Sequence, residues 1–220
     1  MKTRIFLLLV FTFLVSCNKD DTTNPTPNNS NEVTIGTQVW MKKNLDVDYY
    51  RNGDLIPQIT DQTEWASLTT GAWCYYNNDS ANGKIYGKLY NWYAVNDPRG
   101  LAPIGWHIPS DEEWHELENC LGGEDIAGSK LKEAGTAHWN IPNIGATNAS
   151  SFTALPGGWR SFDGYRYSFF LDLGFSGYWW SSTERPLTIS LNRYLDYHHT
   201  NLYEIDGRRY NGFSVRCIKD

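Results

Sequence analysis

Aromatic side chains are the feature that most limits what this chain can fold into. The 220 residues include 10 Trp, 14 Tyr and 9 Phe, but only 2 Met. Each large ring buries roughly 150–250 Å² on folding, so a few short aromatic strands can build a core. The aromatic residues occur in short clusters, which turn residues such as Asn52 and Gly53 separate. We therefore expect a loop-rich domain with short strands.

The first 17 residues have the pattern of an export signal. Lys2 and Arg4 precede an apolar run over residues 5–15, which only Thr12 interrupts. A membrane span needs about 20 apolar residues, so this run has the length of a signal-peptide core instead. The segment LVSC, which ends at Cys17, resembles the lipobox of bacterial lipoproteins. We predict a signal peptide over residues 1–16 and a lipid on Cys17. The alternative is an ordinary secretory signal in which Cys17 is incidental.

Residues 17–32 are predicted to be a tether. Asn18 to Asp21 resemble the lysine-plus-two-acids signal that sends lipoproteins of the Bacteroidetes group to the outer face of the outer membrane. Thr, Asn, Pro and Ser then dominate up to Glu32, and such a composition buries too little apolar surface to fold. We expect a protein anchored to the outer membrane by its lipid and exposed at the cell surface. Residues 33–220 have a length that suits one domain.

Charge argues against a nucleic-acid partner. The formal net charge is −6, and removal of Lys2 and Arg4 with the signal peptide lowers it to −8. Nucleic-acid binding depends on clustered lysine and arginine, which release counterions from the phosphates. An acidic chain without such clusters does not fit that class of partner.

One helix is strongly indicated, over residues 110–121. Ser110 at the N-cap and Glu113 three residues later form a capping box, and Gly122 follows the last apolar residue. Trp114, Leu117 and Leu121 share one face at helical spacing. We also expect a shorter helix over residues 126–134, extended chain over 33–50 and a strand over 72–76. A second aromatic run covers 89–95, and turns with short strands follow from residue 136.

Three cysteines lie beyond Cys17. Cys120 falls on the apolar side of the predicted helix, Cys217 lies in the last predicted strand, and Cys74 lies in an aromatic strand. An exported protein meets an oxidising compartment, so we expect one disulfide and one free thiol. The first choice is a Cys120–Cys217 bridge, and Cys74–Cys217 is the second. Connectivity does not follow from the sequence alone.

Six segments, spread in order over residues 33–220, resemble the Fibrobacter succinogenes major paralogous domain, a family of bacterial surface and secreted proteins. They are WMKKNL (40–45), GKLYNWYAV (87–95), GWHIPSDEEW (105–114), FTALPGGWR (152–160), GYWWSST (177–183) and GFSVRC (212–217). Members of the family carry a cysteine just before the Pro-x-Gly-Trp-His segment, whereas this chain has Ala102 there. No disulfide is therefore carried over from the family.

The same motifs are distantly similar to the formylglycine-generating enzyme and to C-type lectin-like folds. That similarity implies a single compact α+β domain. It would contain two short helices, short twisted antiparallel strands and long loops. The enzyme's active-site thiol pair has one counterpart here, Cys217, and no second cysteine lies near it in sequence.

No catalytic, cofactor or metal site is predicted. A zinc site needs three or four convergent ligands, and the Glu112–His115 pair is better explained as the solvated side of a helix. Adjacent strand residues face opposite ways, so His198 and His199 do not ligate one ion together. The loop motifs of calcium-dependent lectins are absent, as is a Gly-x-Ser-x-Gly nucleophile motif.

Aromatic and polar residues of the C-terminal third remain as a predicted binding face. Ring faces can stack on sugars while amides and carboxylates meet hydroxyl groups, and the same composition also suits protein partners. One of Trp179 and Trp180 is expected in the core, and the other either outward or under a loop. The favoured function is a non-catalytic binding or adhesion module for glycan or envelope protein. The alternatives are a structural coat protein and a relative of the formylglycine-generating enzyme. The predicted face comprises Arg166, Trp180, Tyr194, Asp196, Tyr197, His199, Tyr203 and Arg208.

Overall fold

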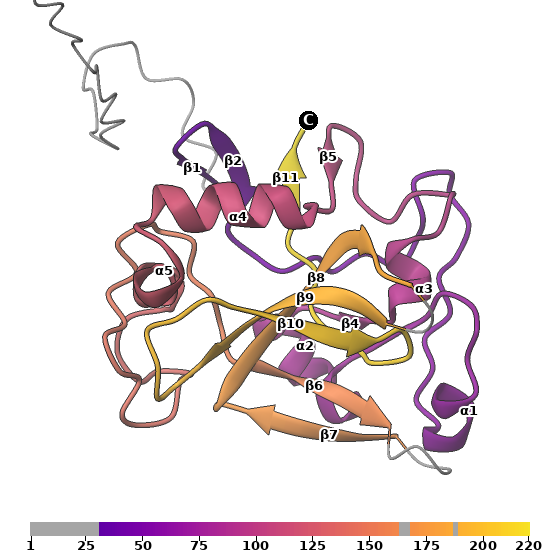
Figure 1. Cartoon of the computed structure of the whole chain (residues 1–220). Helices are drawn as coiled ribbons and strands as arrows, with labels where there is room; N and C mark the ends of the chain where they lie inside the picture. Colours follow the sequence, from indigo (N-terminus) through magenta and orange to yellow (C-terminus); the bar gives the residue numbers. More distant parts are fainter. Residues whose placement is uncertain (1–30, 163–167, 187–188) are drawn as a thin grey trace, which may run out of the picture.

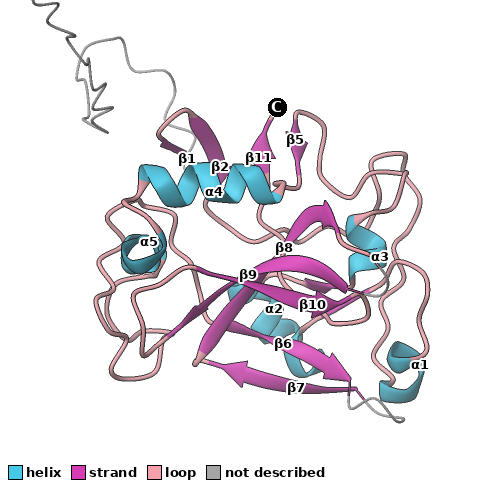
Figure 2. Ribbon diagram, in the orientation of Figure 1, coloured by secondary structure: helices cyan, strands magenta, loops and turns pink. Residues whose placement is uncertain are grey.

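The computed structural model describes residues 31–162, 168–186 and 189–220, and these form an α+β domain (Figure 1). Cys17 and Arg166 lie outside the described residues. Within the described part, no helix is both long and apolar enough to cross a membrane. Of the two larger sheets, one lies at the top of the view and the other crosses its middle and bottom (Figure 2).

The first sheet joins the two ends of the domain. Its order is β1-β2-β11-β5, and every neighbouring pair is antiparallel. The β1–β2 hairpin turns at Gly36, whose φ of 61° favours glycine. Ile218 of β11 pairs with both Trp40 and His107, so the last strand lies between the first hairpin and a mid-chain strand. The strands are β1 (Glu32–Ile35), β2 (Gln38–Met41), β5 (Trp106–His107) and β11 (Ile218–Lys219).

The second sheet is larger and forms from the C-terminal part of the chain. Its order is β10-β9-β8-β6-β7, with β6 and β8 parallel and the other pairs antiparallel. The sheet is strongly twisted from the β9–β10 end to the β6–β7 end (Figure 2). A two-stranded pair, β3 (Trp73–Cys74) with β4 (Leu89–Tyr90), is separate. The strands of the larger sheet are β6 (Gly157–Phe162), β7 (Ser168–Leu173), β8 (Ser176–Glu184), β9 (Ile189–Asp196) and β10 (Tyr203–Arg208).

The predicted helix at residues 110–121 is confirmed as α4 (Asp111–Cys120). Ser110 and Glu113 form both hydrogen bonds of the capping box, and Trp114 and Leu117 are fully buried. The next helix, α5 (Glu124–Leu131), ends earlier than predicted, because Lys132 turns to an extended conformation and buries its ammonium group. The remaining helices are α1 (Gln62–Ala66), the 3₁₀ turn η1 (Tyr76–Asn78), α2 (Ser80–Tyr86) and α3 (Trp92–Val95).

More helix forms early in the chain than the sequence indicated. The aromatic run at residues 89–95 divides into β4 and α3, because the Asn91 side chain accepts a hydrogen bond from Ala94 N–H and caps the helix. Trp179 and Trp180 are both buried, at 1% and 0% exposure, so neither ring faces outward. Both faces of β8 are covered, since Trp179 packs with Leu117 and Leu195 whereas Trp180 contacts Phe213.

The predicted disulfide is wrong, because no disulfide joins Cys74, Cys120 and Cys217 in the part of the chain that the structure describes. Each thiol belongs to a different part of the core. Cys217 packs with Leu45 and Tyr90, Cys74 lies in a small cluster with Trp65, and Cys120 borders the cluster around Trp114. The tertiary fold therefore places the three cysteines among different sets of neighbours.

Candidate functional site

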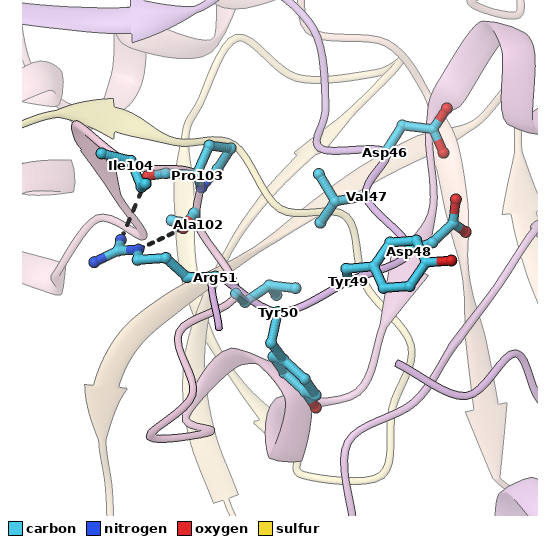
Figure 3. Close-up of a pocket in the computed structure, with 10 residues that line it drawn as sticks. Asp46, Val47, Asp48, Tyr49, Tyr50, Arg51, Ala102, Pro103 and Ile104 are labelled. Atoms are coloured by element: carbon cyan, nitrogen blue, oxygen red, sulfur yellow. Dashed lines mark hydrogen bonds between the residues drawn. The ribbon is translucent and has the colours of Figure 1, made fainter. Parts of the chain in front are cut away.

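A cavity of about 450 Å³ lies between two loops, residues 46–51 and 101–104 (Figure 3). This volume is within the range of ligand pockets, which is about 300–1,000 Å³. The wall from the first loop carries two carboxylates and two phenol rings, whereas the second loop is mainly aliphatic. The lining residues are Asp46, Val47, Asp48, Tyr49, Tyr50, Arg51, Leu101, Ala102, Pro103 and Ile104.

Two carboxylates at this cavity are held by one buried lysine. Lys88 Nζ lies 2.7 Å from Asp46 Oδ1 and 3.1 Å from Asp48 Oδ1. Burial by itself would lower the pKa of Lys88, but hydrogen bonds with the two aspartates outweigh it and raise the pKa. The ammonium group also lies 4.3 Å from the centre of the Trp73 ring. Both aspartate side chains are about half exposed, at 48% and 50%, so they remain available to a ligand.

A buried phenol fixes the backbone between these aspartates. Val47 N–H donates to the Tyr90 hydroxyl at 2.8 Å, and that hydroxyl donates to Val47 O at 2.8 Å. Tyr90 is fully buried, and burial raises its pKa well above the ordinary value, so the hydroxyl stays protonated. Because alternate residues of extended chain face opposite ways, fixing Val47 directs Asp46 and Asp48 to one side. The carboxylates are thus positioned before any ligand arrives.

Arg51 joins the two loops that form the cavity. Its Nε donates to Ala102 O at 3.1 Å and its Nη2 donates to Trp106 O at 2.8 Å. Figure 3 shows the guanidinium reaching across to the second loop. A backbone hydrogen bond from Arg51 N to Gly100 O, at 2.7 Å, adds to this connection. The cavity walls are therefore tied together by bonds that need no ligand.

Exposed apolar groups surround the opening. Tyr49 is 57% exposed and Ile104 is 83% exposed. Tyr49 also pairs with the exposed Leu55 across a short bridge. Carboxylates beside an exposed phenol ring and aliphatic groups can accept hydrogen bonds from hydroxyls while a ring covers an apolar face. This arrangement suits a neutral ligand that has several hydroxyl groups.

Several residues of the predicted C-terminal face do gather around the ends of β9 and β10. The Tyr194 ring lies 5.7 Å from Tyr203, and Tyr203 lies 6.0 Å from His199, between ring centres. Asp196 Oδ1 accepts hydrogen bonds from His198 N and His199 N, so this carboxylate organises the turn. A hollow of about 540 Å³ beside Tyr197 is lined by Trp139, Ile141 and Phe175, among others. It is somewhat more open to solvent than the cavity at residues 46–51.

Other members of the predicted face do not belong to it. Trp180 is fully buried, because its ring packs against Phe213 and its Nε1 donates to Tyr90 O. Including Trp180 was therefore wrong. Asp196 is also buried, at 7% exposure, and serves the turn rather than the surface. Arg208 is exposed near Tyr210, with its guanidinium 6.0 Å from that ring.

The cavity residues were not among the sequence-predicted site residues. The signal that could have indicated them is the alternation of Asp46 and Asp48 beside two tyrosines, at the end of the predicted extended segment. Lys88 and Tyr90 lie about 40 residues further along the chain, so their contribution depends on tertiary contacts. No local pattern reveals such a pairing.

Comparison with known proteins identifies the family. The model of the Fibrobacter succinogenes major domain matches residues 33–219. Searches of curated proteins and of solved structures returned no match. The matched segment includes both large sheets, the helices and both loops of the cavity. The chain therefore belongs to the Fibrobacter succinogenes major domain family.

Proposed function

We propose that this chain is a lipid-anchored protein of the outer membrane whose domain binds glycans without turning them over. The cavity between residues 46–51 and 101–104 is the proposed binding site. The observation that carries the proposal is the preformed pair of carboxylates, Asp46 and Asp48, beside the exposed Tyr49 ring. Sites that hold their polar groups in place before binding lose less entropy when the ligand arrives.

The C-terminal face is the alternative surface. Tyr194, Tyr203 and His199 offer neighbouring rings, and they suit an envelope-protein partner as well as a glycan. The distant similarity to C-type lectin-like folds and to the formylglycine-generating enzyme stays a prediction from the motifs.

A glycan array tests the binding site directly. We would probe residues 22–220, which contain all described elements, with calcium and separately with a chelator. Three proteins are compared: wild type, Tyr49→Ala and Tyr194→Ala. Tyr49 is mostly exposed, so its removal leaves the core intact. We expect glycan binding that survives the chelator, is lost in Tyr49→Ala and persists in Tyr194→Ala.

A second variant tests the carboxylates. Asp48→Asn removes one charge but leaves Asp46 at 2.7 Å from Lys88, so the buried ammonium keeps a partner. We expect it to weaken glycan binding at least about tenfold, because a charged hydrogen bond contributes roughly 1.5–3 kcal/mol. Loss of binding only in Tyr194→Ala would move the site to the C-terminal face. A blank array would reject the glycan proposal in favour of a protein partner or a structural coat.

The anchor needs its own test. Cells expressing the full chain would be labelled with a radioactive fatty acid, and surface exposure would be measured by adding protease to intact cells. We expect label on wild type and on Cys120→Ala, and none on Cys17→Ala. Label that persists in Cys17→Ala would contradict the proposed lipidation, and protection from protease would contradict surface display.

A further inference from the structure

We infer that Asp111, His115 and Glu204 form a binding site for a divalent transition-metal ion of the zinc type. Their ligand atoms all lie within 4.8 Å of one another. His115 Nε2 lies 3.6 Å from Asp111 Oδ2 and 3.2 Å from Glu204 Oε2. Ligand atoms bonded at 2.0–2.1 Å to a tetrahedral ion lie about 3.3 Å apart, so these spacings match a zinc centre.

The backbone places these ligands from two elements. Asp111 and His115 are four residues apart on α4, which puts both side chains on one face of the helix. Glu204 approaches from β10, where it pairs with Arg193 of β9. The local pattern pairs His115 with Glu112, but the structure brings Asp111 and Glu204, which lies 89 positions further on, to this histidine. Among the described residues, no other three His, Cys, Asp or Glu side chains converge in this way.

Each carboxylate directs one oxygen to His115 and is held by at least one arginine. Asp111 Oδ1 pairs with the buried Arg193, while its Oδ2 faces the histidine. Glu204 Oε1 pairs with Arg185 at 3.0 Å, while its Oε2 faces the histidine and lies 3.3 Å from Arg193 Nη1. The arginines thus orient the oxygens that would bind the ion, which is how outer groups support metal ligands.

The second nitrogen of His115 also has an acidic neighbour. His115 Nδ1 lies 3.8 Å from Glu118 Oε2, and Glu118 is buried. Metal-binding histidines commonly direct their other ring nitrogen to a carboxylate, which selects the tautomer that leaves the ligating nitrogen free. At 3.8 Å this contact is a charge pairing rather than a hydrogen bond, and it places a buried carboxylate on the far side of the imidazole from the proposed ion.

Charge and access also permit a cation here. The three carboxylates of Asp111, Glu118 and Glu204 exceed the two guanidinium groups of Arg185 and Arg193 by one negative charge. A dication therefore does not meet a positively charged site. The His115 side chain is 48% exposed, so an ion can reach it, and solvent can supply a fourth ligand.

Zinc titration of residues 22–220, after removal of metal with a chelator, tests this site. Calorimetry measures affinity and stoichiometry, and Co²⁺ in place of Zn²⁺ reports tetrahedral coordination through its visible absorption. We expect one ion per chain. His115→Ala should weaken zinc binding more than about 100-fold, and Glu118→Gln by about 10–100-fold, the usual effect of changing an outer group.

His199→Ala is the matched control, because His199 is also an exposed histidine next to a carboxylate. It should bind zinc like wild type. Thermal unfolding without metal checks that every variant folds. Wild-type protein that binds no zinc would overturn the inference, and so would His115→Ala binding with unchanged affinity. If zinc affinity fell equally in His115→Ala and His199→Ala, the binding would be nonspecific surface binding, and this result would also overturn the inference. The glycan array is a separate readout, so failure of one proposal is distinguishable from failure of the other.

Discussion

Lys132 is fully buried and donates its three N–H groups to backbone carbonyls of Ile144, Asp196 and His199, at 3.0, 2.9 and 2.8 Å. These carbonyls lie at the end of β9 or in loops, where regular sheet bonding does not continue, and a buried carbonyl without a donor is costly. An ammonium group supplies three donors from one side chain. Lys88 works in a comparable way at the cavity, where it joins two aspartates. At the scale of residues, buried cations organise the loops.

Lys88→Met tests this role at the cavity. The change leaves Asp46 and Asp48 without their shared partner, so the carboxylates repel each other and the loop loses its fixed position. We expect the free energy of unfolding to fall by about 1–3 kcal/mol, which is less than for a fully buried pair because both aspartates are half exposed. Urea denaturation measures the loss.

Lys84→Met is the control for Lys88→Met, because Lys84 is an exposed lysine of α2. It should change the free energy of unfolding by less than about 0.5 kcal/mol. If both variants unfold at the same urea concentration as wild type, Lys88 does not organise the loop.

At the scale of elements, α4 is the clearest unit. Its start is set by reciprocal hydrogen bonds between Ser110 and Glu113, and Trp114 and Leu117 bury its inner face. The same Glu113 also reaches His107 of β5, whose Nε2 lies 2.7 Å from Glu113 Oε1. The N-terminus of the helix is thereby connected to the edge of the first sheet.

Ser110→Ala should destabilise the domain by about 1 kcal/mol, because it removes the side-chain acceptor for Glu113 N–H. Chemical denaturation, with the midpoint and slope both fitted, measures the change. Ser80→Ala is the control, since Ser80 is an exposed serine inside the first turn of α2 and is not its N-cap. Equal stability of the two variants would contradict the capping role.

The contact between His107 of β5 and Glu113 of α4 makes the stability of the folded domain depend on pH. Burial by itself would lower the pKa of His107, but hydrogen bonds with Glu113 and Asp220 outweigh it and raise the pKa above 6.5. A raised pKa means that the folded protein binds the proton more tightly than the unfolded chain. The resulting stabilisation is complete below about pH 6.5 and is lost as pH rises through the folded pKa.

We therefore expect His107→Gln to lower the melting temperature more near pH 5.5 than near pH 8.5. Thermal unfolding by circular dichroism at both pH values measures the difference. His198→Gln serves as the reference, because His198 stacks on Tyr197 at the surface and forms no ion pair with an acidic residue of another element among the described residues. If His107→Gln lowered the melting temperature equally at both pH values, the raised pKa of His107 would be contradicted.

At the scale of the whole molecule, separate aromatic clusters give each cysteine its own environment. Burial raises the pKa of Cys74 to about 11 and that of Cys217 to about 12, so both thiols stay protonated at neutral pH. A protonated buried thiol is a poor nucleophile. The fold is therefore held by packing rather than by a covalent link among these three residues.

We expect all three thiols of residues 22–220 to be alkylated after denaturation without a reductant. In the native protein, Cys74 and Cys217 should react far more slowly than the partly exposed Cys120. Mass spectrometry of the alkylated peptides measures both results, and Cys120→Ser identifies the fast site. Finding a pair of protected cysteines in the denatured, unreduced chain would show that a disulfide forms after all.

The sequence by itself determined the features that depend on near neighbours. The capping box and apolar face of α4 lie within twelve residues, and each family motif is a short continuous segment of the matched region. The α+β character and the aromatic core could also be predicted from such local patterns. The second helix was found, but its end was not, because the turn at Lys132 depends on carbonyls more than ten residues away.

Only the tertiary structure decided which side chains meet. It buried Trp180, separated the three cysteines, joined residues 46–51 to 101–104, and brought Glu204 to His115. Such contacts depend on how sheets and loops pack across long stretches of chain. The periodicity of apolar residues and the capping motifs indicate only how residues close together in sequence are arranged. The cavity and the proposed metal site are both of this long-range kind, which is why neither could be read from local pattern.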